Sequence, residues 1–555
     1  MDPAKLDSSP LTTRRLALLS FIVFLIFACV FVLFRSRDPL AADGSFRCFE
    51  VFRRQTLFFH GSNHMLYPVN VLLWTRLAAF VGLHVGDPPS FFYVTELMNC
   101  FAAAACLALF FLLISFLSRS WRLAATVTAV YGLSKAFLLH ATNASEPMVG
   151  VLWSFLAVAA AALSLKTKSL WPVFFSGLLF ALAMATYQSA VLLGPAALFV
   201  VWRSRSAENQ IVPRPPSRFM AVLVFGLGAI IGCSAIYGWS IYLQGKRQPT
   251  GSSYSVVAAQ IFQHPDARAF FGVSMAKFAT VPVGLVRNIF PILPEFIGLR
   301  SVLRGSFLPI VVLAFLLLAI GILIAFNAVC VSKSWNSLSR TSRTAFIAGV
   351  LGLVFSLIPV VTWSDQYDKL WLQPLACLCL LLGLSLHWIS RQFPSRLALA
   401  RGVAVLALAG VLLNFGWLET QHVLEIPEMR EVQRLAAMMR PSDLVVGDWD
   451  GVSTLYGYGW AADGQLISFP SEAVYYGSEA TSRLRDAVLK TQNAGGRVFF
   501  LSILDTPKVS WDSFLASRCG VPYSALDLYR AHSLTRATFT TRVREIALKQ
   551  YETAP

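Results

Sequence analysis

Charged side chains are scarce in this sequence. Only 14% of its 555 residues are Asp, Glu, Lys or Arg, whereas 56% are hydrophobic; an ordinary soluble domain has about 25% charged residues. Acidic residues are the scarcest, at 29 against 46 Lys and Arg, which leaves a net charge of +17. This composition predicts a polytopic membrane protein. The positive charge does not indicate a nucleic-acid partner, because basic residues fill short segments between apolar runs and orient them.

Cysteine outside apolar runs is also rare. Of nine cysteines, only Cys48 and Cys519 lie in polar segments; a disulfide between them is an open alternative that their spacing does not support. A clean cleavage site for a signal peptide is missing as well. The first apolar run, 16–33, is long enough to remain as a membrane anchor.

Apolar runs near the roughly 20 residues that cross a bilayer recur along the chain. They predict about eleven transmembrane helices, at 16–33, 92–117, 123–141, 148–165, a broken pair within 170–202, 219–243, 306–331, 344–362, 371–390 and 402–418. Arg14 and Arg15 precede the first run, which predicts a cytoplasmic amino terminus. The pair within 170–202 is predicted to break at Thr186–Ser189, where polar residues interrupt the run.

Two long segments that this topology places outside carry many basic residues. The first, 35–91, has six arginines and includes a predicted interface helix at 68–85; the second, 244–305, has seven basic residues. Long loops translocate largely regardless of charge, which is one explanation. The other is that these loops hold an anionic ligand at the outer leaflet.

The hydropathy changes after the transmembrane domain, residues 1–418. Residues 419–555 are predicted to form a small extracytoplasmic α/β domain with a partial doubly wound sheet. Buried strands are expected within 442–451 and 495–504, and a helix at 480–494. The turn that ends the first strand matches no phosphate-loop spacing, which favours a structural or substrate-orienting role for this domain.

The polar loop 35–68, between the first two predicted spans, is the best place for chemistry. Asp43 near its start could act as a general base for an acceptor hydroxyl or amine while a lipid-linked phosphate leaves. Basic residues could neutralise that phosphate. A solvated loop aspartate that caps a helix is an equal alternative from the residues alone.

These features resemble the GT-C superfamily of polytopic glycosyltransferases, in particular its protein O-mannosyltransferase and aminoarabinose-transferase branches. In those branches an acidic pair begins the first outer loop and a Pro-Pro-Leu-type motif begins the interface helix. Here Ala42-Asp43-Gly44 and His64-Met65-Leu66-Tyr67-Pro68 occupy these places. The similarity covers about residues 14–390 and continues in the turn 143–147, the broken pair 177–199 and the turn 363–371.

Two departures from the family pattern stand out. The acidic pair is reduced to one aspartate, and Met65-Leu66 replaces the Pro-Pro. Glu50 could supply a second carboxylate, since a helix from Ser45 would place it within two turns of Asp43. The resemblance thus implies catalysis by Asp43 and makes Glu50 the second catalytic candidate.

The resemblance also implies a function. The expected enzyme is an integral protein of a bacterial cytoplasmic (inner) membrane, with its C-terminal domain outside. It would transfer a hexose or pentose from a polyprenyl-phosphate-linked donor to a glycan, lipid or protein acceptor, with inversion at the anomeric carbon. No nucleotide site or other cofactor is expected.

Polar residues near the predicted outer ends of the spans are the candidates for substrate binding. They are His60, His64, Tyr67, Glu146, Gln188, Lys277, Arg287, Asp365 and Lys369. Arg287 stands out, because an arginine in an apolar surrounding needs a partner and a phosphate is a suitable one. Local alternatives remain for others: Glu146 could cap the next helix, and Lys369 could pair with a neighbouring aspartate.

No metal site is predicted. His60 and His64 are four residues apart, but Gly61 makes a shared helix doubtful and no third ligand has matching spacing; dependence on a divalent metal is left open. The main alternative function is a transporter or flippase for a lipid-linked saccharide. Such a protein should carry ionisable residues deep in its spans. Only Glu96 and Lys135 are notable, and both are predicted near span ends.

Overall fold

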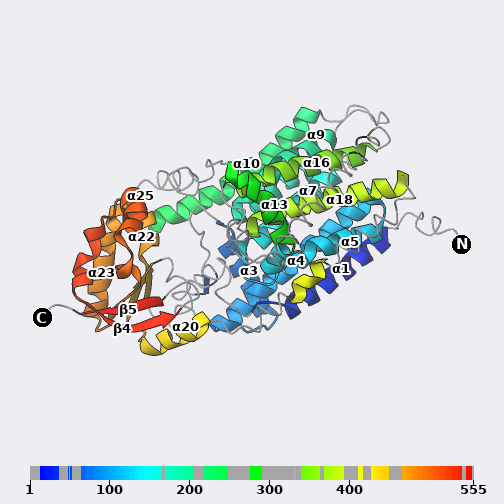
Figure 1. The fold of residues 1–555 in the computed structure, drawn as a ribbon. Coiled ribbons are helices and arrows are strands. Elements are labelled where there is room, and N and C mark those ends of the chain that lie inside the picture. The colour runs from blue at the N-terminus through cyan, green and yellow to red at the C-terminus, as the bar shows by residue number, and fades with distance from the viewer. Residues whose placement is uncertain are drawn as a thin grey trace. The chain divides into compact units, whose positions relative to one another are not determined.

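The computed structural model describes residues 13–36, 48, 51–52, 64–164, 169–204, 217–247, 275–290, 329, 332, 335, 339–362, 368–392, 410–416, 427–448, 465–540 and 545–552 (Figure 1). The chain divides into two compact units. The helical unit comprises Met1–Ser36, Thr56–Leu77 and Thr95–Gln421. The C-terminal unit comprises Arg37–Gln55, Ala78–Val94 and His422–Pro555. The predicted domain boundary between residues 418 and 419 remains a prediction, because this division into compact units does not test it.

Long apolar helices dominate the first part of the chain. In order they are α1 (Thr13–Leu33), α3 (Tyr67–Phe80), α4 (Pro88–Ser118), α5 (Trp121–Gly132), α6 (Lys135–Ala141), α7 (Glu146–Leu163), α8 (Trp171–Thr186), α9 (Gly194–Ser204), α10 (Arg218–Arg247), α13 (Met275–Ile289), α16 (Arg340–Ser356), α17 (Ile358–Thr362) and α18 (Leu372–Gln392). Two 3-10 helices, η1 (Gln188–Leu193) and η3 (Asp368–Trp371), precede α9 and α18.

Six of these segments are long and apolar enough to cross a membrane. They are Thr13–Leu33, Ser90–Ser118, Glu146–Leu163, Arg218–Trp239, Thr341–Thr362 and Asp368–Trp388, and they confirm six of the predicted spans. The predicted break in 170–202 is also confirmed, because α8 ends at Thr186 and η1 begins at Gln188. Most of 306–331 and part of 402–418 lie outside the described residues, so the count of eleven spans stays a prediction.

The predicted straight span 123–141 is bent. The axes of α5 and α6 meet at 73°, which exposes backbone carbonyls at the bend. Polar side chains bond to these carbonyls: Ser134 Oγ donates to Tyr131 O at 2.7 Å, and Asn414 Nδ2 donates to Leu133 O at 2.6 Å. Bends inside a membrane are tolerated when neighbouring groups satisfy the backbone in this way.

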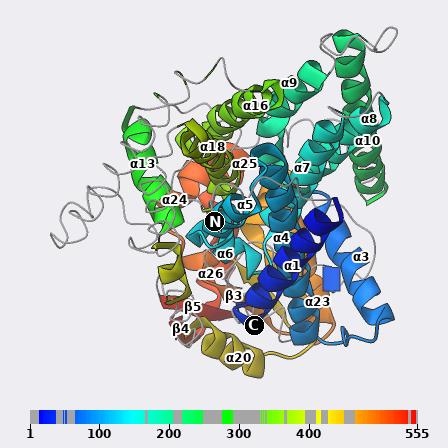
Figure 2. The same ribbon diagram turned by 90° about the vertical axis from the view of Figure 1, so that its right-hand side faces the viewer.

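Small residues set the closest helix contacts of the helical unit. Figure 2 shows α8 and α10 side by side. A Cβ added to Gly177 would lie 2.1 Å from Phe225 O, and one added to Gly228 would lie 2.3 Å from Phe174 O. Glycine is therefore required at both positions for the two backbones to approach, as is common where membrane helices pack without a hydrophobic driving force.

The C-terminal unit contains a five-stranded sheet in the order β2-β1-β3-β5-β4. Its strands are β1 (Leu444–Gly447), β2 (Gln465–Ser468), β3 (Val498–Leu501), β4 (Ser533–Thr540) and β5 (Glu545–Tyr551). β1 pairs in parallel with β2 and β3, whereas β5 pairs antiparallel with β3 and β4. The predicted strands within 442–451 and 495–504 are thus confirmed as the parallel centre of this sheet, and α23 (Ala480–Asn493) confirms the helix predicted at 480–494.

Both faces of the central strands are covered. Val446 and Phe500 pack with residues of α22 (Phe469–Tyr476) and α23 on one face. Val445 and Phe499 pack with Leu435 of α20 (Pro427–Met438) on the other. Burial on both faces explains why these strands are unbroken apolar runs in the sequence.

One ion pair fixes the start of β1. Asp443 is fully buried and accepts hydrogen bonds from Arg497 Nη2 at 2.6 Å and from the backbone N–H of Arg440 and Arg497, each at 2.8 Å. Burial alone raises the pKa of a carboxyl group, but the hydrogen bonds from Arg497 and Arg440 outweigh it and hold the pKa of Asp443 below its usual value.

Candidate functional site

Several charged side chains are buried in the helical unit, most of them at helix ends. In its described residues, Glu96, Lys135, Glu146, Arg287 and Asp368 are each at most 9% exposed. Lys135, Glu146 and Asp368 begin α6, α7 and η3, and Arg287 lies in the last turn of α13. Burying charge in a membrane protein is costly, so such residues are a functional-site hypothesis by default.

Asn99 of α4 holds the turn that precedes Glu146. Its Nδ2 group donates to the carbonyl oxygens of Asn143 at 2.6 Å and Ser145 at 2.8 Å. The Ser145 hydroxyl is also 2.7 Å from His140 Nδ1. These contacts satisfy buried carbonyls that the turn would otherwise leave unpaired, and they fix the first turn of α7 against α4.

The end of α1 is attached to the same turn. Ser36 N–H donates to Thr142 O at 2.7 Å, and Arg35 lies 3.9 Å from the Glu96 carboxylate, one helical turn from Asn99 along α4. The polar loop that carries Asp43 begins directly after Ser36. Arg35 and Ser36 are therefore fixed beside the turn that leads to Glu146.

Tyr187 connects two segments that lie far apart in the sequence. Its ring stacks on His64 with a centroid distance of 5.5 Å and an interplanar angle of 12°. Its hydroxyl donates to Lys369 O at 3.1 Å, across 182 residues. The break between α8 and η1 thus positions a buried tyrosine between the His64 segment and η3.

The His64 segment is docked onto the end of α8 by further polar contacts. His64 Nδ1 lies 3.1 Å from Thr186 O, and Leu66 N–H donates to Ala185 O at 3.1 Å. His64 itself has a left-handed backbone with φ of 57°, a conformation that is uncommon but tolerated by His more than by most residues. Three contacts maintain this conformation. They are the stacking of the His64 ring on Tyr187, the contact of His64 Nδ1 with Thr186 O, and the backbone hydrogen bond from Leu66 to Ala185.

Gly150 of α7 brings Glu146 close to Tyr187. A Cβ added to Gly150 would lie 2.4 Å from Tyr187 Cβ, so only glycine allows this approach. Glu146 is four residues earlier on the same helix, which places it on the same face and about 6 Å along the axis. Glu146 therefore lies about one helical turn from the point where α7 contacts Tyr187.

Arg287 comes from a helix that packs on these same elements. α13 contacts α6, α17 and η3, and α6 contacts η3. Asn414 Nδ2 ties the end of α13 to the bend after α5, since it donates to both Ile289 O at 2.8 Å and Leu133 O at 2.6 Å. The elements that carry Lys135, Arg287 and Asp368 thus form one packed group.

The structure places some of the predicted site residues and not others. Asp43, Glu50, His60 and Asp365 lie outside the described residues, and for Lys277 only its position in α13 is described. Tyr67, Glu146 and Arg287 are buried, His64 and Lys369 are half-buried, and Gln188 is exposed directly after Tyr187. Their functional roles remain predictions.

Sequence reasoning missed several residues of this site. Asn99 and Tyr187 were not predicted, and Lys135 and Glu96 were treated only as possible transport residues. A lone asparagine or tyrosine in an apolar helix carries a weak signal, because its partners lie far away in sequence.

Among the described residues, no group of three His, Cys, Asp or Glu side chains is arranged to hold a metal ion.

Comparison with known proteins identifies the fold. A scan against protein-family models found no match, and neither did a search of curated proteins. Among solved structures, ArnT from Cupriavidus metallidurans bound to undecaprenyl phosphate aligns with a TM-score of 0.56 at 10% identity, over 98% of this chain and 99% of that chain. The same protein in the apo state has a TM-score of 0.49 at 14% identity, over 96% and 97%.

A third solved structure is an archaeal oligosaccharyltransferase. The enzyme of Archaeoglobus fulgidus in the apo form aligns with a TM-score of 0.47 at 12% identity, over 95% of this chain and 74% of that chain. The alignment with undecaprenyl-phosphate-bound ArnT runs through both units of the chain. This protein therefore has a GT-C-like fold, as its sequence pattern predicts.

Proposed function

We propose that this protein is a membrane glycosyltransferase that moves a sugar from a polyprenyl-phosphate-linked donor to an acceptor. The observation that carries the proposal is the set of buried charged residues described above, most of them at helix ends, within a GT-C-like fold. The solved structure that aligns over 98% of the chain contains bound undecaprenyl phosphate. A site of buried cations and carboxylates suits a reaction in which an anionic lipid phosphate leaves and an acceptor loses a proton.

In the proposed reaction, the acceptor hydroxyl or amine attacks the anomeric carbon of the donor. The new bond forms as the bond between that carbon and the phosphate oxygen breaks, so the configuration inverts and polyprenyl phosphate leaves with the bonding electrons. Asp43 accepts the proton of the acceptor, with Glu50 as the second candidate. Arg287, Lys277 and Lys369 compensate the charge of the phosphate.

The remaining candidates would bind sugar or acceptor. His64 and Tyr67 lie on the segment docked on Tyr187, and Glu146 lies one helical turn from the Tyr187 contact at Gly150. Gln188 is exposed beside them, and His60 and Asp365 belong to the same proposal. Carboxylates, amides and hydroxyls at such a site suit the hydroxyl groups of a sugar.

The topology completes the proposal. About eleven spans would place the amino terminus inside a bacterial cytoplasmic membrane, with the site and the α/β domain on the outer side. The proposed reaction uses no nucleotide. Turnover measured with and without EDTA tests whether a divalent metal is required.

Asp43→Asn tests the assignment of the base. Purified full-length protein in detergent would be incubated with a panel of radiolabelled polyprenyl-phosphate sugars, and released polyprenyl phosphate would be measured. General-base catalysis contributes about 10²- to 10⁴-fold, so Asp43→Asn should lose turnover by that factor. Asp38→Asn, five residues earlier in the same loop, is the matched control and should keep it. Turnover retained by Asp43→Asn would move the base to Glu50.

A transporter or flippase of a lipid-linked saccharide is the alternative function. Glu96 favours it, because this carboxylate is 2% exposed inside a predicted spanning helix, and intramembrane ionisable residues mark transport pathways. Proteoliposomes with a labelled donor in one leaflet separate the two functions. Movement of intact donor between leaflets without its consumption would favour the transporter.

A further inference from the structure

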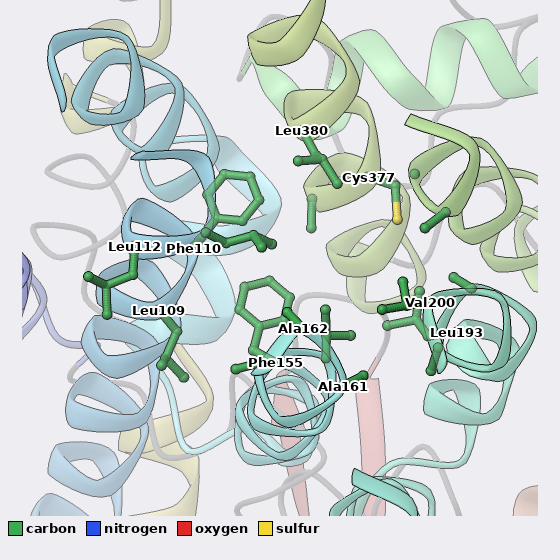
Figure 3. Close-up of a pocket in the computed structure, with 18 of the residues that line it drawn as sticks. Leu109, Phe110, Leu112, Phe155, Ala161, Ala162, Leu193, Val200, Cys377 and Leu380 are labelled. Atoms are coloured by element: carbon green, nitrogen blue, oxygen red, sulfur yellow. The ribbon is translucent and has the colours of Figure 1, made fainter. Parts of the chain in front are cut away.

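An apolar cavity of about 390 Å³ lies within the helical unit, among α4, α7, α9, α16 and α18. Figure 3 shows side chains from α4, α7, α18 and the η1–α9 segment converging on it. Phe110 and Phe155 stack at its wall with a centroid distance of 5.9 Å. Alanines such as Ala162 and Ala197 line it where larger residues would fill the space. A void of this size forfeits dispersion contacts, so a hydrocarbon chain is its natural occupant.

Three arginines follow or precede the outermost lining residues at one end of this cavity. The lining residue nearest the end of α4 is Phe116, three residues before Arg119, and on α9 it is Val200, three residues before Arg203. On α16 the lining begins at Ala348, five residues after Arg343. At 1.5 Å per residue, each arginine lies about 5 to 8 Å along its helix from the cavity.

Tryptophans mark the same end as a membrane–water boundary. Trp121, Trp171 and Trp202 are 36%, 66% and 41% exposed. The guanidinium of Arg122 lies 5.6 Å from the ring centroid of Trp121, and that of Arg218 lies 5.8 Å from the ring centroid of Trp202. Exposed Trp beside Arg is typical of the interface level of a bilayer.

We propose that this cavity binds one acyl chain of an anionic glycerophospholipid, whose phosphate is held by Arg119, Arg203 and Arg343. The apolar wall accepts the chain, and the three cations select a negatively charged headgroup over a zwitterionic one. The arginine end of the cavity is distinct from the proposed sugar-transfer site. Gln373, which lines the opposite end, is four residues from Lys369. The proposal does not depend on the proposed glycosyltransferase function.

Lipid binding would be measured by native mass spectrometry of the full chain in detergent. The probes are phosphatidylglycerol, phosphatidylcholine and undecaprenyl phosphate, each added at the same concentration. Wild type is expected to retain one phosphatidylglycerol and to bind phosphatidylcholine at least about tenfold more weakly, since interfacial arginines favour an anionic headgroup.

Three variants locate the bound lipid. Ala197→Leu fills the cavity and should abolish retention, and Ala162→Leu gives a second test on a half-buried wall position in case Ala197→Leu does not fold. Leu198→Phe, on an outward-facing residue of the same helix that is 36% exposed, is the volume control and should bind as wild type. The double variant Arg203→Gln and Arg343→Gln should lose the preference for phosphatidylglycerol.

Two results would overturn the proposal. Equal binding of phosphatidylglycerol and phosphatidylcholine, or retention in both cavity-filling variants, would show that the cavity and arginines do not select this lipid. Displacement of phosphatidylglycerol by undecaprenyl phosphate, one for one and sensitive to Ala197→Leu, would instead assign the cavity to a polyprenyl chain. These binding measurements do not depend on turnover. Loss of transferase activity in Asp43→Asn would therefore neither support nor contradict the lipid proposal.

Discussion

Gly150→Ala should disrupt the site without touching any charged residue. The added Cβ would lie 2.4 Å from Tyr187 Cβ and 3.3 Å from its backbone nitrogen. Ordinary carbon contacts need about 3.5 Å or more, so Tyr187 or α7 must move by about 1 Å. The Tyr187 ring stacks on His64 and its hydroxyl bonds to Lys369 O, so both segments would be displaced with it.

A displacement of this size should be visible in turnover. Misplacement of reacting groups by 1 Å can cost about 10²-fold in rate. We therefore expect kcat for the polyprenyl-phosphate sugar to fall about 100-fold in Gly150→Ala, measured per folded molecule after size-exclusion chromatography in detergent. A smaller loss would follow if α7 yields instead of Tyr187.

Two other glycine variants provide matched controls. Gly226→Ala on α10 adds a Cβ that meets nothing within 4 Å, so it should keep activity and stability. Gly177→Ala puts a Cβ 2.1 Å from Phe225 O, away from the site, and should lower the melting temperature while the folded fraction keeps its kcat. The reasoning is refuted if folded Gly150→Ala turns over as fast as Gly226→Ala.

Two further variants test the buried polar contacts of each unit. Asn99→Leu removes the donors to Asn143 O and Ser145 O; leaving such groups unsatisfied should cost about 2 kcal/mol, and an unchanged melting curve in detergent would contradict this. Asp443→Ala removes the partner of Arg497 and should destabilise the C-terminal unit by about 2 kcal/mol, read from faster hydrogen exchange in β1. Because the pKa of Asp443 is lowered in the fold, its stabilisation is present above about pH 3.9 and is lost as the pH falls through the folded pKa. Wild-type protection of β1 should therefore fall in acid, whereas Asp443→Ala should lack this step.

Much of the helical architecture could be predicted because a membrane-spanning helix has a length set by the bilayer. The interruption at Thr186–Ser189 was visible because polar residues broke an apolar run. The bend between α5 and α6 was not predicted, although Gly132, Ser134 and Lys135 interrupt the apolar run 123–141 at that point. One of the contacts that stabilise the bend comes from Asn414, which donates to Leu133 O across 281 residues, and a partner that far away cannot be identified from the local sequence.

The C-terminal sheet was predicted only in its centre. β1 and β3 are buried on both faces and appear as apolar runs. β2 and β4 have mostly exposed or half-exposed residues, so hydropathy does not reveal them, and the antiparallel pairing of β5 depends on long-range contacts. Edge strands of this kind are generally less visible than central ones.

The candidate site shows the same limit. Individual residues such as Arg287 could be singled out, because a charge among apolar neighbours is unusual. Their grouping could not, since the contacts of Tyr187 and Asn99 join segments that are 182 and 46 residues apart. Sequence therefore named several candidate side chains but not the packing that brings their segments together.

The most direct test of the account is a product balance in detergent, where no bilayer exists for transport to occur. Purified wild-type protein would be given a doubly labelled polyprenyl-phosphate sugar, and free polyprenyl phosphate and released or transferred sugar would be counted. The account predicts one polyprenyl phosphate for each sugar transferred to an acceptor or to water. Donor that binds but is recovered intact from every member of the sugar panel would contradict it.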